Sequence, residues 1–536
     1  MTTGHRSAGS GDDPEVRQAK RGRLSRDSIL AIALTAILCI AGMWALLAST
    51  RLGPVVWTDS IIYLTGARNW LAGLGLSWST CDAIKPSIVY PPLFPLMLAG
   101  FDLLRVDPVQ AGRLINIAAY GLSGALVAIY AARATRAPLA GPVAALLFLV
   151  APGIAGMHLG MMTDGPYLTF CLIALLFLAA YSRNGRAWLL IVAGAAAGMA
   201  YLTRYIGLAL VLSGVVFLAL RSTRWRTLVR EAIVFAGIAL APIALWYARN
   251  LVVSGSLSAY RILLREIDVV SVLAGLQMTW DWFLPGFLLR AIGQSDMVLV
   301  SLSALALIAL FAGGVFLTRR IRRTESMGRG DTIHALIALV FLLVYLGVYF
   351  GSVVAVFIPP TISERYLAPA YTMLLILVVM AAVYAWRKSG WFPRAVIVLV
   401  TAVLVWNKGL WSRGLLAQAY SDGLAYTSVE WRNSATIARI RDLEPGLIYS
   451  NDVAAVAFLA DRPACTLPDA FRVSTAEVDF NPESPAAFRN RLQSEGAVLV
   501  LFNRAPPETY ADVVEGLVLL DEYPDGRIYG ANQPGR

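Results

Sequence analysis

The chain has little charge for its length. Of its 536 residues only 15% are charged, whereas 58% are hydrophobic. Soluble globular proteins contain about 25% charged residues and roughly 45–50% apolar residues. A soluble multidomain protein is therefore excluded, and we expect a chain that crosses a membrane many times.

Signatures of metal and nucleotide binding are missing from the sequence. The four cysteines, at positions 39, 81, 171 and 465, have no CxxC spacing, which argues against a zinc site and against a disulfide framework. No glycine-rich nucleotide fingerprint occurs either. The formal net charge is +11, but in a multi-pass protein Lys and Arg act first as orientation signals. We therefore expect no metal centre of cysteines and no nucleic-acid partner.

Long apolar runs account for the hydrophobic excess. A helix needs about 20 apolar residues to cross a hydrocarbon core about 30 Å thick. The run at 28–48 is longer than the core of a cleavable signal, which has about 7–15 residues, so we predict a retained first membrane helix. With it, eleven membrane helices are predicted, the others at 109–132, 139–153, 165–181, 188–203, 205–220, 232–248, 296–318, 333–351, 367–386 and 395–411.

Lys and Arg are distributed unevenly between the two sides of these helices. With a cytoplasmic N-terminus, the segments on the inner side contain 22 Lys and Arg residues and those on the outer side contain 10. Because basic loops resist translocation, we predict a multi-pass plasma-membrane protein in this orientation. It has a basic cytoplasmic tail at 1–27, a membrane domain at 28–411 with a long outer loop at 51–108, and an extracytoplasmic domain at 412–536.

The last part of the chain has the composition of a soluble protein. Short apolar runs at 446–450, 497–502 and 517–520 alternate with helical patterns at 452–460, 486–494 and 508–514. Strands separated by helices indicate a small α/β domain, for which we expect a structural or acceptor-docking role. Cys81 and Cys465 both fall on the outer side, so a disulfide between them is an open alternative. The predicted fold class is mainly α, a polytopic membrane protein with this small C-terminal domain.

Few ionisable residues occur at the ends of the predicted membrane helices, where charges tend to have a function. Asp59 begins an amphipathic stretch of the outer loop, and Asp164 begins the fourth helix. Three cations fall on the same outer side: Lys85, Arg204 and Arg365. Plainer explanations remain open, since the acids could cap helices and the arginines could anchor helix ends at the interface.

Two carboxylates and three cations at one membrane face suit group transfer from a lipid phosphate. A carboxylate can take the proton of an attacking hydroxyl. Cations can stabilise the charge that builds on a phosphate leaving group. In the outer segment 249–295, aromatic residues such as Trp280 and Trp282 could line a sugar subsite or form an interfacial belt.

The chain resembles the GT-C superfamily of integral membrane glycosyltransferases, and within it the protein O-mannosyltransferase and aminoarabinose transferase group, glycosyltransferase family 39. The resemblance spans most of residues 50–370 and rests on five elements in order: Trp57-Thr58-Asp59-Ser60-Ile61-Ile62-Tyr63, Tyr90-Pro91-Pro92-Leu93, Thr163-Asp164-Gly165-Pro166, Leu202-Thr203-Arg204 and Glu364-Arg365-Tyr366-Leu367-Ala368-Pro369. Two positions depart from the family. Ser60 stands where many members have Glu, and Arg204 stands where relatives often have Lys, which keeps the charge but changes its geometry.

The resemblance implies the GT-C fold and an inverting sugar transfer. The donor would be a polyprenyl-phosphate sugar, and the acceptor a hydroxyl of a protein, lipid or cell-wall glycan. Asp59 would be the catalytic base, and Asp164 would support the acceptor side or orient a cation. The donor phosphate would be bound by Lys85, Arg204 and Arg365.

Within the matching elements, Tyr63, Tyr90 and Tyr366 are expected to contact the substrate. The resemblance implies no obligatory cofactor and leaves room for a divalent cation. Two other functions stay open. A transporter or lipid flippase would place charges or broken helices near the bilayer midplane, whereas a non-catalytic assembly subunit would tolerate loss of Asp59, Asp164 and Arg204 together.

Overall fold

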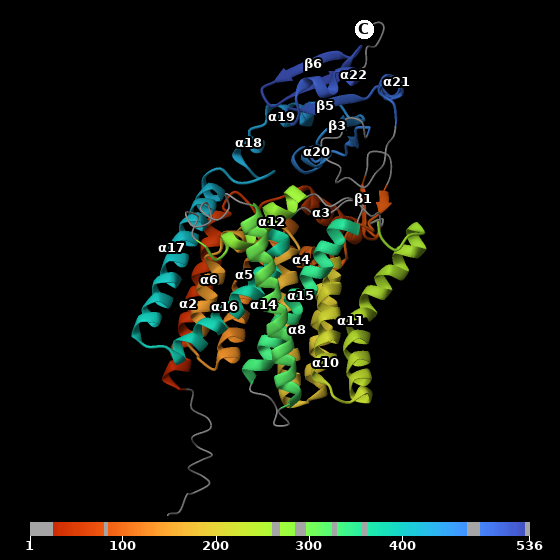
Figure 1. Ribbon diagram of the computed structural model, residues 1–536. Coiled ribbons are helices and arrows are strands. Elements are labelled where there is room, and N and C mark those ends of the chain that lie inside the picture. Colours follow the sequence, from red (N-terminus) through yellow and green to blue (C-terminus); the bar gives the residue numbers. More distant parts are fainter. Residues whose placement is uncertain are drawn as a thin grey trace, which may run out of the picture.

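A computed structural model of the chain describes residues 25–79, 84–259, 269–284, 296–323, 330–355, 362–468 and 483–530. A bundle of roughly parallel helices carries a smaller domain of strands and short helices at one end (Figure 1). Most of the predicted N-terminal tail, and Cys81, lie outside the described residues.

Eight helices in the described part of the chain are long and apolar enough to cross a membrane. Ser25 caps the first, because its hydroxyl accepts a hydrogen bond from the backbone N–H of Ser28 at 3.1 Å. The eight are α2 (Arg26–Ser49), α5 (Pro108–Thr135), α8 (Asp164–Asn184), α11 (Trp225–Ser254), α14 (Asp296–Arg323), α15 (Gly330–Ala355), α16 (Glu364–Lys388) and α17 (Trp391–Ser421).

The three other predicted runs form shorter or bent helices. The run at 139–153 divides into α6 (Ala140–Leu149) and α7 (Pro152–Leu159), which are bent by 63°. Pro152 explains the break, because proline disfavours the helical conformation of the residue before it. The remaining two runs are α9 (Ala187–Thr203) and η1 (Tyr205–Gly207) with α10 (Leu208–Arg221). Apart from the break before Pro152, the eleven predicted runs are helical.

The outer loop forms its own elements at the end of the bundle that faces the small domain. They are α3 (Thr58–Leu71), β1 (Ser77–Ser79), β2 (Ile84–Pro86) and α4 (Leu93–Leu103), and α12 (Val269–Asp281) lies at the same end (Figure 1). The predicted amphipathic helix is confirmed as α3. Its residues Tyr63, Leu64 and Ala67 are buried in one cluster with Phe94 of α4.

The small domain is built on a five-stranded sheet in the order β4-β3-β5-β7-β6. Strand β3 pairs in parallel with β4 and β5, while β7 is antiparallel to β5 and β6. The three predicted strands and three predicted helical segments are confirmed, whereas β4 and β7 were not predicted. The elements are α18 (Val429–Arg432), α19 (Ala435–Asp442), β3 (Ile448–Ser450), α20 (Val453–Leu459), β4 (Cys465–Thr466), α21 (Pro485–Glu495), β5 (Val498–Phe502), η3 (Pro507–Tyr510), α22 (Ala511–Val514), β6 (Val518–Tyr523) and β7 (Gly526–Gly530).

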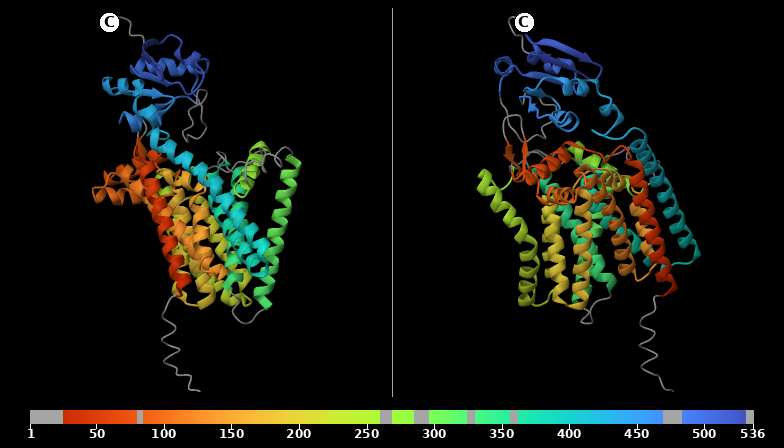
Figure 2. Two further views of the ribbon diagram at one scale, coloured as in Figure 1. Left: turned by 90° about the vertical axis from the view of Figure 1, so that its left-hand side faces the viewer. Right: turned by 180° about the vertical axis from the view of Figure 1, so that it is seen from behind.

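The two faces of this sheet bury different clusters, as expected from strand alternation. Val500 and Phe502 of β5 pack in a cluster that also contains Val56 and Ile61 of the outer loop. Leu499 and the other alternate residues pack against α21 and α22 on the far face. The domain is therefore joined to the membrane bundle by apolar packing, over the end where α3 lies (Figure 2).

The cysteines divide into two kinds. Cys39 and Cys171 are free and buried in the bundle. Cys465, at the start of β4, is disulfide-bonded. A bond to Cys81 was one of the alternatives left open by the sequence, and Cys81 lies outside the described residues.

Candidate active site

Asp59 lies in the first turn of α3, and the chain before it is held on both sides. Val55 forms a parallel bridge with Gly160, which follows α7, and Val56 forms one with Ala425, in the linker after α17. Backbone hydrogen bonds therefore join three distant parts of the sequence immediately before the acid. This local arrangement fixes the start of α3, and with it the position of the Asp59 carboxylate.

The Asp59 carboxylate contacts two side chains rather than capping its own helix. The Tyr90 hydroxyl donates to Oδ1 of Asp59 at 2.7 Å. A guanidinium nitrogen of Arg365 lies 3.6 Å from Oδ2. The capping contact is made by Ser60, whose Oγ accepts a hydrogen bond from the N–H of Trp57 at 3.1 Å. The sequence alternative in which Asp59 caps α3 is therefore wrong.

Asp164, at the start of α8, is far more enclosed. Its side chain is 4% exposed, against 29% for Asp59. Oδ1 accepts a hydrogen bond from the Arg204 guanidinium, and Oδ2 lies 3.7 Å from Nε of Arg365. The Arg204 side chain is only 13% exposed. Arg204 is therefore a buried partner of Asp164, and the alternative of an interfacial anchor is wrong.

Arg365 lies between the two carboxylates, because both Asp59 and Asp164 are within 4 Å of its guanidinium. Both distances are longer than a hydrogen bond, for which N–H···O spans about 2.7–3.2 Å. Tyr366 supports both arginines, with its ring centre 4.7 Å from the Cζ of Arg204 and 4.9 Å from that of Arg365. The Tyr366 hydroxyl also accepts a hydrogen bond from Arg365 at 3.1 Å.

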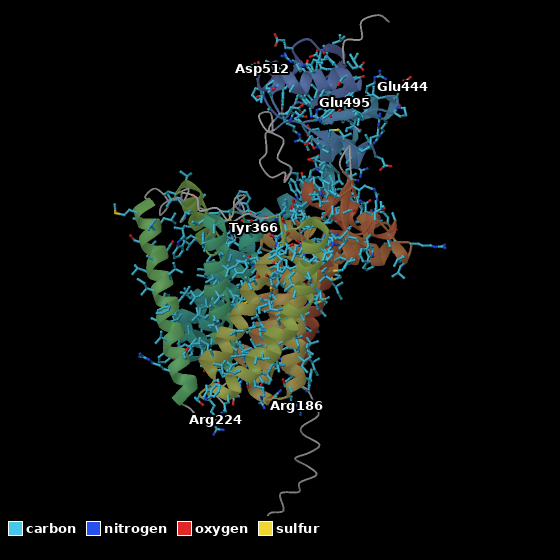
Figure 3. All side chains as sticks on the ribbon, turned by 90° about the vertical axis from the view of Figure 1, so that its right-hand side faces the viewer. Arg186, Arg224, Tyr366, Glu444, Glu495 and Asp512 are labelled. Carbon is cyan, nitrogen blue, oxygen red and sulfur yellow. The ribbon has the colours of Figure 1, made fainter. Side chains whose placement is uncertain are left out.

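A cavity of about 210 Å³ opens beside this group, lined among others by Asp164, Arg204, Arg365 and Tyr366. Oδ2 of Asp164 is buried and has no hydrogen-bond partner within the described chain. Tyr366 lies at the end of the bundle beneath the small domain, whereas Arg186 and Arg224 lie at the opposite end (Figure 3). The site therefore opens at the predicted outer face.

Tyr63 lies beneath the site rather than on its surface. Its ring is buried and packs edge-on against Tyr90, with 5.0 Å between ring centres, and against Phe94 at 5.4 Å. Burial, followed by the negative charge of Asp59, raises the pKa of Tyr63, so its hydroxyl stays neutral. Tyr63 thus supports Tyr90, which in turn binds Asp59, and its own contact with substrate stays a prediction.

Lys85 is exposed, whereas Arg204 and Arg365 are largely enclosed. It is exposed on β2, opposite Trp78 of β1 in the short antiparallel pair. Its predicted contact with a donor phosphate stays a prediction.

No group of three or more His, Cys, Asp or Glu side chains converges in the parts of the chain that the structure describes. The positive charges next to Asp59 and Asp164 are the guanidinium groups of Arg204 and Arg365. The geometry accordingly offers a base beside cationic donors, and the divalent cation stays a prediction.

Sequence reasoning passed over Arg249, which holds the outer loop against α11. Its guanidinium donates to the carbonyls of Ser87 at 2.8 Å and Leu76 at 2.7 Å and lies 4.8 Å from the ring centre of Trp246. In the sequence, Arg249 is only a basic residue near a helix end. Its acceptors are backbone carbonyls more than 160 residues away, so no local sequence pattern could predict these hydrogen bonds. Lys408 and Asp281 were also missed, and Glu364 was noted only as part of the Glu364–Pro369 element, without a role of its own; all three are described below.

Comparison with known proteins bears out the predicted resemblance. A family model described as dolichyl-phosphate-mannose-protein mannosyltransferase matches residues 89–247. No curated protein sequence matches the chain significantly. Among solved structures, ArnT from Cupriavidus metallidurans bound to undecaprenyl phosphate is 15% identical with a TM-score of 0.53, and the match covers 94% of this chain and 97% of that one.

Two further structures match at a similar level. The oligosaccharyltransferase of Archaeoglobus fulgidus is 13% identical with a TM-score of 0.55, over 89% of this chain and 69% of that one. The arabinofuranosyltransferase AftD from Mycobacteria is 14% identical with a TM-score of 0.53, over 95% of this chain and 42% of that one. At these identities the likeness establishes the fold, which is that of the GT-C membrane glycosyltransferases. The comparisons give no support to the transporter alternative.

Proposed function

We propose that this chain, which has the fold of the GT-C membrane glycosyltransferases, transfers a sugar from a polyprenyl-phosphate carrier to an acceptor hydroxyl at the extracytoplasmic face. One observation supports this most. A partly exposed carboxylate, Asp59, lies 3.6 Å from the guanidinium of Arg365, whose Nε lies 3.7 Å from a second, buried carboxylate, Asp164. A base next to preorganised cationic donors matches the charge that develops when a phosphate leaves.

Asp59 is the better base of the two acids. Asp164 is enclosed and already paired with Arg204, whereas the side chain of Asp59 is 29% exposed and can be reached by an acceptor. In the proposed reaction Asp59 takes the proton of the acceptor hydroxyl as its oxygen attacks the anomeric carbon. The bond between that carbon and the phosphate oxygen breaks, and polyprenyl phosphate leaves with the electron pair. Attack from the opposite face inverts the anomeric configuration.

Arg365 and Arg204 have different proposed roles: Arg365 binds the donor phosphate, and Arg204 neutralises Asp164. The Arg365 guanidinium is beyond hydrogen-bond distance of both carboxylates, so it keeps N–H donors for a phosphate. The phosphodiester donor has one negative charge and the released phosphate has up to two, so these donors bind the product charge more tightly than the reactant charge. Arg204 neutralises Asp164, which would otherwise repel the phosphate. Lys85 is proposed to reach the phosphate from the outer loop.

The proposed orientation has the N-terminus in the cytoplasm and the small domain outside. Arg186 and Arg224 lie at the end of the bundle away from that domain (Figure 3), as expected if that end is cytoplasmic. Cys465 in the small domain is disulfide-bonded. Disulfides persist in oxidising compartments, which favours an extracytoplasmic domain. The domain is proposed to position α3 and to dock the acceptor.

The test is turnover of lipid-linked donors by the purified full chain in lipid nanodiscs. A panel of undecaprenyl- and decaprenyl-phosphate sugars, radiolabelled in the sugar, is supplied with cell-envelope extract as acceptor. The expected result is release of polyprenyl phosphate with one donor, together with labelled product of inverted anomeric configuration. Failure to turn over any donor, with the protein folded and monodisperse, would contradict the proposed function.

A further inference from the structure

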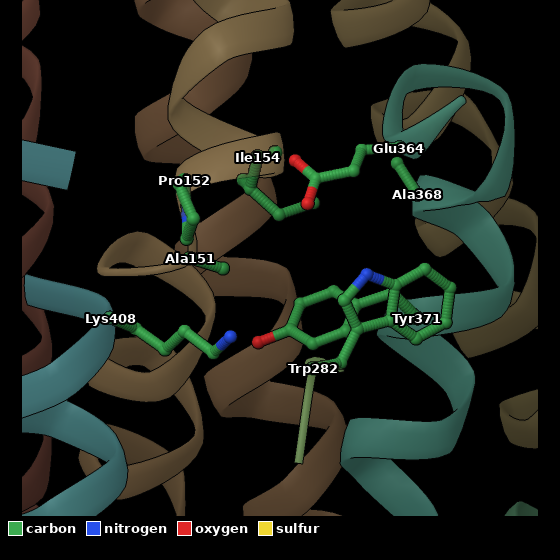
Figure 4. A pocket seen from close by; sticks show the side chains of 9 residues that line it. Ala151, Pro152, Ile154, Trp282, Glu364, Ala368, Tyr371 and Lys408 are labelled. Atoms are coloured by element: carbon green, nitrogen blue, oxygen red, sulfur yellow. The ribbon is translucent and has the colours of Figure 1, made fainter. Parts of the chain in front are cut away.

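A second cavity, here called the Glu364 pocket, lies outside the site described above. It is a partly open hollow with about 340 Å³ of empty space, open solvent included, and its main lining residues are Gly153, Trp282, Glu364, Ala368, Tyr371 and Lys408. Figure 4 shows Glu364 of α16 and Lys408 of α17 entering the same space, bounded by the rings of Trp282 and Tyr371.

The pocket adjoins the site of the phosphate-binding arginines. Glu364 and Arg365 are consecutive residues of the first turn of α16, and consecutive helical residues point in different directions. Arg365 lines the smaller cavity with Asp164, while Glu364 lines the larger one. Ala368, one turn further along α16, lines both cavities. A ligand in the Glu364 pocket would therefore lie next to the reacting groups.

Glu364 is only partly exposed, and within the described chain no hydrogen bond or ion pair within 4 Å reaches its carboxylate, although the charge of Lys408 acts on it across the pocket. Backbone packing makes room for it, because a Cβ added at Gly153 would come within 2.5 Å of Oε2 and 2.8 Å of Cβ of Glu364. Partly buried carboxylates usually have a partner, since an unpaired charge in a cavity is costly. An unpaired carboxylate pointing into a cavity is accordingly available to a ligand that donates hydrogen bonds.

The other polar group of the pocket is already neutralised. Nζ of Lys408 lies 3.0 Å from Oδ2 of Asp281 and also donates to the carbonyl oxygen of Asp281. The ammonium group has three donors, so it can still meet one acceptor of a ligand. A free phosphate is a poor occupant, since the unpaired Glu364 would repel it.

Two aromatic rings supply flat apolar surface. The ring centres of Trp282 and Tyr371 are 5.3 Å apart at an angle of 69°. Tyr371 is anchored, because its hydroxyl donates to the carbonyl of Leu147 at 3.0 Å. A lipid tail would require walls without charge, whereas this pocket combines aromatic faces with hydrogen-bonding charges. A sugar ring has an apolar C–H face and a rim of hydroxyl groups, and it fits both features.

We infer that the Glu364 pocket is a sugar subsite, in which Glu364 accepts hydrogen bonds from ring hydroxyls and Trp282 packs against the ring face. This inference rests on the proposed function and extends it, since the subsite lies beside the phosphate-binding arginines. The sugar is either the one carried by the lipid donor or one in a glycan acceptor. A donor sugar and an acceptor sugar would make the same kinds of contact in the pocket, and the second experiment below distinguishes them.

The first experiment measures binding of simple sugars to the full chain in nanodiscs. Saturation-transfer NMR is recorded with methyl α-mannopyranoside, methyl α-glucopyranoside and methyl α-arabinofuranoside. Binding of at least one glycoside is expected, weakened about tenfold or more in Glu364→Gln, which removes charge-assisted hydrogen bonds. Gly153→Ala, which places a methyl group against Glu364, should weaken it similarly.

Trp280→Ala is the matched control for Trp282→Ala. Nε1 of Trp280 donates to the Ser303 hydroxyl at 2.9 Å, and Trp280 does not line the pocket. Trp282→Ala should therefore weaken glycoside binding, and Trp280→Ala should leave it unchanged. Equal affinities in wild type, Glu364→Gln and Gly153→Ala, or no saturation transfer from any glycoside to wild type, would overturn the inference.

The second experiment assigns the source of the sugar through steady-state kinetics. A raised acceptor KM in Glu364→Gln with unchanged donor hydrolysis by water places the acceptor glycan in the pocket. A raised donor KM in both reactions places the donor sugar there. Unchanged KM values for both substrates would contradict either assignment. If wild type turns over no donor, the proposed function fails, and the binding experiment still decides whether the pocket takes a sugar.

Discussion

At the scale of single residues, Arg365 connects the two acids of the site. Its guanidinium lies 3.6 Å from Asp59 and 3.7 Å from Asp164, and it donates to the Tyr366 hydroxyl. A planar guanidinium can face several acceptors at once, whereas the ammonium of lysine acts as a point charge on a flexible stem. The shape of this side chain, and not only its charge, should therefore matter.

Arg365→Lys is expected to lower kcat by about 100-fold, because one preorganised donor set at the leaving phosphate is lost. Thermal stability should change little, since the positive charge remains. The measurement is donor turnover with the unfolding temperature recorded in parallel. Arg68→Lys, an exposed position on α3, is the matched control and should behave as wild type. Wild-type turnover by Arg365→Lys would show that the guanidinium is dispensable.

Arg204→Gln is expected to destabilise the protein, because it removes the hydrogen-bonded ionic partner of the buried Asp164 and leaves only the longer contact with Arg365 at 3.7 Å. Breaking a buried ion pair from one side typically costs about 3–5 kcal/mol. The double variant Asp164→Asn/Arg204→Gln removes both charges and should recover much of that loss. Thermal unfolding in detergent compares the three proteins. A double variant less stable than Arg204→Gln would contradict the pairing.

The sequence could identify most of these residues but not their contacts. Asp59, Asp164, Arg204 and Arg365 were singled out because charges at membrane-helix ends are rare. Which arginine would meet which acid depends on how four distant segments pack, and no local pattern encodes that. Lys85 satisfied the same charge criterion, and the structure places it on an exposed strand.

At the scale of secondary-structure elements, α3 is held between the membrane bundle and the small domain. The bridges of Val55 and Val56 run to opposite partners, Gly160 and Ala425. On its other side, Phe458 of α20 packs against the cluster that contains Tyr63. The small domain therefore takes part in positioning the helix that carries Asp59.

Phe458→Ala is expected to lower turnover about tenfold although Phe458 does not contact the site, because small displacements of a catalytic group are costly. Val513→Ala is the matched control. Val513 is buried on the far face of the sheet, so its truncation should lower stability without changing turnover below the unfolding temperature. Turnover by Phe458→Ala equal to that of Val513→Ala would argue against positioning by the small domain.

The sequence patterns predicted the membrane helices but missed two strands of the small domain, β4 and β7. The long apolar runs became helices because length and hydrophobicity act locally. Strand β4 was missed because it has two residues, and β7 because its first and last residues, Gly526 and Gly530, weaken the strand pattern. Both strands exist through pairing with distant neighbours.

At the scale of the whole molecule, the account requires the small domain to lie outside the cytoplasm. A cysteine introduced at the exposed Ser494 of α21 should react with a membrane-impermeant maleimide on intact cells. A cysteine at Thr223, at the opposite end of the bundle, should react only after lysis. Among the described cysteines, Cys39 and Cys171 are buried and Cys465 is disulfide-bonded, and wild-type protein labelled in parallel gives the background. Labelling of Thr223→Cys but not Ser494→Cys on intact cells would reverse the proposed orientation.

The most direct test of the central claim compares sugar transfer by wild type, Asp59→Asn and Asp102→Asn in nanodiscs, with the donor identified from the panel. Asp102, on α4 of the same outer loop, provides the same change of charge away from the reacting groups. If Asp59 is the base, Asp59→Asn loses turnover by about 100-fold or more while donor binding and folding persist, and Asp102→Asn keeps wild-type turnover. Transfer by Asp59→Asn at the wild-type rate would contradict the account.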